Sequence, residues 1–169
     1  TLTLSFAATT RGARSTNVQF DTNDPDQPTV SIPLAGVGVV PTTAALDADP
    51  DVGDQGVRDG VGRVGDTAAI DLEVSQALEV VSYAVELIFD PAVVVFQSFA
   101  ADASQTNLLG AVLTPVVTEP ASGTVRVELT GTDTASGDGT LGRWTFAIAN
   151  NAEIGSVTAI GLTRVELLS

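Results

Sequence analysis

The residues of this chain best suited to chemistry are aspartates in an acidic, glycine-rich stretch at 46–66. Closely spaced carboxylates on a flexible turn supply the oxygen ligands that Ca²⁺ prefers. The candidate ligands are Asp47, Asp49, Asp51 and Asp54. Their spacing begins like an EF-hand loop, but Val52 stands where that loop needs glycine and Arg58 where it needs a bidentate glutamate. The stretch therefore predicts either a Ca²⁺ site or a solvated acidic loop.

Catalysis is limited by the residue types that the sequence lacks. The chain contains no histidine, cysteine or lysine. These absences exclude a Ser-His-Asp triad, a thiolate nucleophile and a Schiff base. A pair of carboxylates could still form a glycosidase, but Asp and Glu fall mainly in expected loops or at outward strand positions, where a solvated face is the simpler interpretation. We therefore expect a chain without catalytic activity.

The charge of the chain narrows the classes of partner. The formal net charge is −14, from 21 acidic residues and seven basic ones, all of them arginine. Such a surface repels nucleic acid and anionic lipids, which leaves proteins and cations as expected partners. No apolar run approaches the roughly twenty residues of a membrane-spanning helix. The lysine-free, Asp-rich composition favours an extracellular or cell-surface bacterial protein.

Short segments of alternating apolar residues fill the chain from residue 67 onward, and helical periodicity is almost absent. This pattern predicts an all-β sandwich. The expected strands lie at 70–74, 80–89, 93–99, 113–117, 125–129, 143–148 and 157–168. A long turn is expected at 131–140, and the apolar register changes near Arg164, as a β-bulge or a second short strand would make it.

The few aromatic and basic side chains of this region are candidates for binding or for packing and surface contacts. Tyr83 and Trp144 could form a sugar-stacking platform, but they lie on apolar rows, which favours packing in the core. Arg126, Arg143 and Arg164 occupy outward positions, and we expect them to form surface ion pairs.

The N-terminal part shows three more strand candidates, at 1–7, 16–20 and 30–34, with a turn at 9–15 and a loop at 22–28. Three strands alone expose a sheet edge and half a core. Further residues or another chain must therefore complete this region. Residues 41–66 are expected to form a linker and the acidic loop.

One string in this region carries a resemblance. TNDPDQPTVSIPLAGVG, at 22–38, resembles the closing hairpin of bacterial immunoglobulin-like repeats of the ASH, or major-sperm-protein-like, kind. A complete repeat of this class has about seven strands and 100 residues. The resemblance implies that residues 1–40 form a partial immunoglobulin-like β-sandwich.

The larger part of the chain, residues 44–169, resembles a cohesin domain, the β-sandwich module of cellulosomal scaffolds. Four strings in order carry this resemblance: VGDTAAIDLEV at 64–74, VSYAVELIFDPAVVVFQSF at 81–99, GDGTLGRWTFAIA at 137–149 and VTAIGLTRVELL at 157–168. The resemblance implies a cohesin-like jelly roll at 67–169, preceded by an acidic lead-in, that binds protein through one sheet face with dockerin as the partner class. Contact residues on that face follow no motif, so none is transferred to this sequence.

These observations lead to one expected function and two alternatives. We expect a non-catalytic extracellular assembly or adhesion module, a structural subunit of a surface stalk or filament that polymerises with itself by strand exchange. One alternative is a cohesin-like recognition module that binds a dockerin-type partner. The other is a carbohydrate-binding module, against which the aromatic content of 5% argues.

Overall fold

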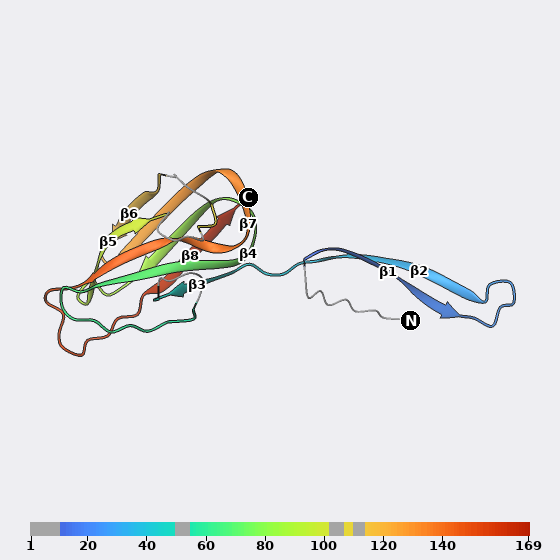
Figure 1. Cartoon of the computed structure of the whole chain (residues 1–169), viewed down its shortest axis with the longest axis horizontal. Coiled ribbons are helices and arrows are strands. Elements are labelled where there is room, and N and C mark those ends of the chain that lie inside the picture. The colour runs from blue at the N-terminus through green and yellow to red at the C-terminus, as the bar shows by residue number, and fades with distance from the viewer. Residues whose placement is uncertain (1–10, 50–54, 102–106, 110–113) are drawn as a thin grey trace. The chain divides into compact units, whose positions relative to one another are not determined.

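The computed structural model describes residues 11–49, 55–101, 107–109 and 114–169. The chain divides into two compact units, with the boundary after Pro41. Every regular element of the described residues is a β-strand (Figure 1). The all-β class expected from the sequence is confirmed.

The N-terminal unit contains one antiparallel hairpin of β1 (Gly12–Asp21) and β2 (Thr29–Gly38). Its turn is held by hydrogen bonds, among them one from the Thr22 N–H to the Pro28 carbonyl at 2.8 Å. The expectation of a turn at 9–15 is wrong for its described part, because cross-strand pairing extends β1 back to Gly12. The expected strand at 1–7 lies outside the described residues.

The C-terminal unit is built on two long antiparallel strands, and each contributes to both layers of a sandwich. Its six strands are β3 (Thr43–Asp47), β4 (Thr67–Ile88), β5 (Val94–Ala100), β6 (Val116–Ala121), β7 (Thr124–Ile148) and β8 (Gly161–Leu168). In one layer, the first half of β4 pairs with the second half of β7, flanked by β3 and β5. In the other layer, the second half of β4 pairs with the first half of β7, flanked by β8 and β6.

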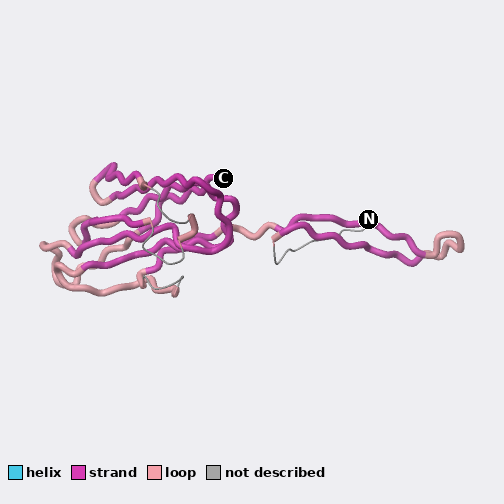
Figure 2. Tube along the Cα trace, turned by 45° about the horizontal axis from the view of Figure 1, so that its top comes forward, coloured by secondary structure: helices cyan, strands magenta, loops and turns pink. Residues whose placement is uncertain are grey.

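The passage of β4 and β7 from one layer to the other corrects two expectations. The expectation of separate strands at 70–74 and 80–89 is wrong, because β4 runs continuously through both segments. The expectation of a turn at 131–140 is also wrong, because β7 runs continuously through it. The pairing shifts register several times between Leu72 and Ser82 of β4. Gln76 and Glu79 there have positive φ angles, as at bulges that bend a strand. The glycine-rich composition of β7 thus marks a bend within a strand, which the trace in Figure 2 shows.

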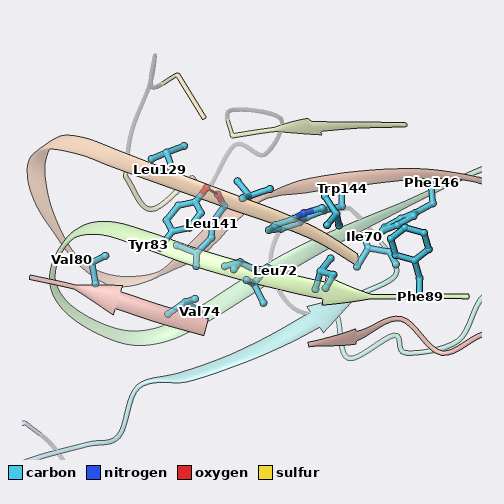
Figure 3. Packing of buried hydrophobic residues seen from close by; sticks show 14 of the residues in the cluster. Ile70, Leu72, Val74, Val80, Tyr83, Phe89, Leu129, Leu141, Trp144 and Phe146 are labelled. Atoms are coloured by element: carbon cyan, nitrogen blue, oxygen red, sulfur yellow. Dashed lines mark hydrogen bonds between the residues drawn. The ribbon is translucent and has the colours of Figure 1, made fainter. Parts of the chain in front are cut away.

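A single hydrophobic core fills the space between the layers (Figure 3). Trp144 and Tyr83 are among its largest fully buried side chains, which confirms the expected core packing. The Tyr83 hydroxyl donates to the Leu141 carbonyl at 2.6 Å. Phe146 contacts the rings of Phe89 and Phe96 edge to face, with centroid distances of 5.2 and 5.9 Å.

The edge strands differ from the sequence-based expectation in smaller ways. β3 lies within 41–66, which was expected to be linker and loop, because its TAALD segment becomes a strand only by pairing with β4. β8 begins at Gly161, later than expected. Of the two explanations given for the register change near Arg164, the bulge is the one observed, since the pairing of β8 with β4 skips Thr163.

Candidate binding surface

The predicted metal ligands are only partly placed by the structure. Asp47 ends β3 and is fully buried, and its carboxylate accepts the backbone N–H groups of Asp49 at 3.1 Å and Gln55 at 2.8 Å. The Asp49 side chain is exposed, whereas Asp51 and Asp54 lie outside the described residues. Within the described ranges, no three acidic side chains gather in a way that could hold a metal ion. The Ca²⁺ site stays a prediction.

The outer side of the layer β3–β4–β7–β5 is closed by a buried ion pair. Asp71 alternates with the core residues of β4 and therefore points outward, yet its side chain is only 1% exposed. Arg143 on β7 donates to both of its oxygens, from Nε at 2.7 Å and Nη2 at 2.8 Å. The bidentate geometry compensates the desolvation of the carboxylate. The ion pair expected for Arg143 is confirmed, but the solvated position expected for Asp71 is wrong.

A second buried contact lies on the same side of this layer. Glu73, two residues after Asp71, is also buried, and Thr140 of β7 donates its hydroxyl to Glu73 Oε1 at 2.7 Å. In the strand register, Asp47 on β3 lies directly opposite Asp71 on β4, so these buried acidic residues are neighbours on the same side of the layer. These outward side chains are covered and bonded to other parts of the chain, so the part of this side formed by β3 and β4 offers little sheet surface to a partner. Exposed side chains remain at its edge on β5, where Val95 is 48% exposed.

The outer side of the other layer is uncovered, and we call it the open face. Its side chains come from β6, the first half of β7, the second half of β4 and β8. They alternate with buried core residues, as expected for strands with one solvated side. The open face consists of Val116, Thr118, Arg126, Glu128, Ala84, Glu86, Ile88, Arg164, Glu166 and Leu168.

The strand pairings arrange this surface in rows. One row runs across the four strands as Thr118, Arg126, Glu86 and Arg164. The next row runs as Val116, Glu128, Ala84 and Glu166. Ala84 therefore lies near the centre of the open face, between two glutamates, and it is itself only 7% exposed, at the lowest point of its row.

Ion pairs along the strands hold the charged side chains of the open face in place. Arg126 pairs with Glu128 on β7, and Arg164 pairs with Glu166 on β8, where Nη2 and Oε2 are 2.5 Å apart. The hydrogen bond from Arg164 lowers the pKa of Glu166 below its usual range. These contacts confirm the ion pairs expected for Arg126 and Arg164. Together with Glu86, these residues give the open face two positive and three negative groups, a balance far less acidic than that of the whole chain.

Apolar side chains border these charges. Ile88 and Leu168 are 44% and 55% exposed, and Val116 on the edge strand β6 is 57% exposed. The open face thus offers both apolar contact area and fixed charges, and fixed charges can recognise complementary groups of a partner. The sequence alone did not identify these residues as a group. Only their outward positions in the alternating pattern pointed to them, and the neighbours of each strand became known with the topology.

The described residues provide neither a sugar-stacking platform nor a membrane-spanning helix. The only tyrosine and the only tryptophan are buried, so neither can stack on a sugar. In the part of the chain that the structure covers, no helix is long and apolar enough to cross a bilayer.

Comparison with solved structures relates the fold to known proteins. The sixth cohesin of Acetivibrio cellulolyticus scaffoldin B, solved in complex with a Cel5 dockerin, superposes with a TM-score of 0.55 at 17% identity, covering 76% of this chain and 86% of the cohesin. A cohesin module of a Clostridium perfringens family 33 glycoside hydrolase gives a TM-score of 0.54 at 14% identity, covering 75% and 82%. The second type II cohesin of the A. cellulolyticus adaptor scaffoldin ScaA gives 0.53 at 12%, covering 77% and 80%.

Sequence comparisons add no closer relationship. No protein-family model matches the chain, and no curated protein matches it. The resemblance of residues 22–38 to the ASH-like repeat is not confirmed. The structural matches show that this all-β chain has the jelly-roll β-sandwich fold of cohesin modules.

Proposed function

We propose that this chain is a non-catalytic recognition module that binds a protein partner through the open face. The observation that carries the proposal is the difference between the two layers. Over β3 and β4, one outer side is closed by buried Asp47, Asp71 and Glu73, whereas the other carries ordered ion pairs beside exposed apolar side chains. Charged groups held in place by ion pairs can meet complementary charges of a partner, and the apolar side chains at the margin add contact area.

A dockerin-type module is the partner class that we propose. Two solved cohesins of similar fold, from A. cellulolyticus scaffoldin B and from ScaC, were crystallised in complex with dockerins. Their identities of 17% and 14% to this chain carry the fold, so the partner itself belongs to the proposal. Absence of histidine, lysine and cysteine from the chain supports a module without catalytic activity.

Titration calorimetry with a panel of purified dockerin modules tests this proposal. We expect at least one module to bind the wild-type chain and Ala84→Arg to weaken that binding at least about tenfold, since a long side chain at the centre of an interface blocks close packing. Gln97→Arg, at an exposed position of β5 in the other layer, is the matched control and should bind normally. Binding that survives Ala84→Arg, or no binding by any module, would contradict the proposal.

The other expectations from the sequence depend on different parts of the chain. A role as a stalk or filament subunit would use the N-terminal unit rather than the open face, and it stays a prediction. The extracellular or cell-surface setting rests on composition alone. The carbohydrate-binding alternative loses its support, because both residues of the suggested platform, Tyr83 and Trp144, are buried in the core.

A further inference from the structure

The hairpin of the N-terminal unit has one apolar side and one polar side. The apolar side carries Val18 and Phe20 from β1 and Val30, Ile32 and Leu34 from β2. The register places Val18 opposite Ile32 and Phe20 opposite Val30, so these side chains form one continuous strip. We call it the apolar strip.

The opposite side of the hairpin has a different composition. Asn17 lies opposite Pro33 and Gln19 opposite Ser31, and all four are exposed. A hairpin with such a division is built to bury one side, because each apolar side chain favours removal from water.

Within the N-terminal unit, the described residues provide no second layer for the apolar strip. β1 and β2 form a two-stranded sheet, and none of their residues belongs to the hydrophobic core. Ile32 remains 46% exposed in the middle of the strip. An isolated two-stranded hairpin is marginally stable in water, so a sheet packed on this side would stabilise it.

Charges at the two ends of the strip indicate what that sheet is. Arg14 has the same register parity as Val18 and Phe20, and it lies on the apolar side at the open end of the hairpin. Asp24 and Asp26 lie at the closed end, in a turn whose shape is fixed by internal hydrogen bonds such as that from the Asp26 N–H to Asp24 Oδ1 at 2.9 Å. The hairpin is thus positive at one end and negative at the other.

A second copy of the same hairpin, laid antiparallel on the first, matches this arrangement. About eight residues separate Arg14 from the start of the turn, which is roughly 27 Å of strand. An antiparallel copy with its axis near Val18 therefore brings each Arg14 to the turn of the other copy while the apolar strips face each other. Gly36, which pairs with Arg14, leaves room for that turn.

We propose that two copies of this chain associate through their β1–β2 hairpins, packed face to face and antiparallel, with the apolar strips buried and each Arg14 beside Asp24 and Asp26 of the other copy. This is an isologous contact, in which the same surface serves both partners. The residues of this contact belong to the N-terminal unit and are distinct from those of the open face.

The first test is the association state of the full chain by sedimentation velocity over a range of concentrations. Because the interface is small, we expect a reversible dimer with a dissociation constant on the order of 10 μM. Ile32→Asp places a charge in the apolar strip and should weaken the dimer at least tenfold. Ser31→Asp places the same charge on the neighbouring residue of the polar side, and this matched control should dimerise like the wild type.

The second test is a charge exchange between copies. Arg14→Asp opposes carboxylates to carboxylates at both ends of the dimer. Asp26→Arg places a second cation beside Arg14 and leaves only Asp24 to oppose it, so each variant alone should dimerise more weakly than the wild type. An equimolar mixture restores an opposite-charge contact at both ends and should form a heterodimer. Asp26 is chosen because the Asp24 carboxylate also holds the turn.

Three results would overturn the proposal. The first is a wild-type chain that stays monomeric at about 100 μM, as expected if residues of the same chain cover the strip. The second is a dimer that Ile32→Asp leaves intact, which would place the contact elsewhere. The third is failure of the charge-exchanged mixture to associate, which would exclude the antiparallel arrangement.

Discussion

Replacing Arg143 by leucine should strongly destabilise the C-terminal unit. The substitution keeps an apolar stem but removes both hydrogen bonds to Asp71, whose carboxylate is 1% exposed. Removing one partner of a buried ion pair costs about 3–5 kcal/mol, because the other charge stays buried without compensation. The Arg143 side chain is 23% exposed, so water reaches the gap, and we expect the lower end, about 3 kcal/mol.

The assay is urea unfolding at neutral pH, followed by the fluorescence of Trp144, the only tryptophan of the chain, and by circular dichroism. A loss of about 3 kcal/mol corresponds to a fall of about 10 °C in melting temperature for a unit of this size. Arg126→Leu is the matched control. It breaks a pair whose side chains are 31% and 47% exposed, and it should cost less than about 1 kcal/mol.

A double variant separates the charge effect from lost packing. Asp71→Leu combined with Arg143→Leu removes both charges, and it should be more stable than Arg143→Leu alone, since no buried carboxylate is left unpaired. Equal losses for Arg143→Leu and Arg126→Leu, or a double variant as unstable as the single one, would refute the reasoning.

Three further predictions concern other buried or acidic groups. Tyr83→Phe should cost about 1–3 kcal/mol in urea unfolding, because the buried Leu141 carbonyl loses its donor. Burial raises the pKa of Tyr83 above its ordinary value of 10.0, so the wild type should lose stability as the pH rises beyond 10, and Tyr83→Phe should lose less over the same range. Asp47→Ala should cost about 2 kcal/mol, since two backbone N–H groups lose a buried acceptor, and unchanged stability would contradict this role. If the acidic stretch binds Ca²⁺, millimolar Ca²⁺ should raise the melting temperature of the wild type and Asp51→Asn should reduce the rise, whereas a melting temperature indifferent to Ca²⁺ and to chelator would dismiss the site.

The alternating pattern of the sequence predicted much of the fold. Tyr83 and Trp144 were expected in the core, and both are buried there, because a residue on an apolar row of a strand has only one covered side to occupy. The same reasoning placed the register change near Arg164. Local alternation is therefore enough to identify the strands and the side chains that point inward.

The continuity of the long strands could not be predicted in the same way. Polar and glycine-rich residues around Gly137 look like a turn, yet they lie in the bend of β7. Whether such a segment turns back or bends onward depends on which strand pairs with it, here β4. That partner is distant in sequence.

The binding surface was the least accessible part of the structure to sequence reasoning. Asp71 and Glu128 both occupy outward positions, and nothing local tells them apart. The first is buried by an arginine on a neighbouring strand, whereas the second remains exposed on the open face. The difference arises from what covers each layer, a property of the tertiary structure alone.

Chemical-shift mapping of the isotopically labelled chain during titration with a bound partner tests the location of the binding surface most directly. We expect the changes to concentrate on the open face, in residues 82–88, 116–121, 124–130 and 161–168. Changes concentrated instead on β3 and β5, in the layer closed by Asp71 and Arg143, would contradict the account.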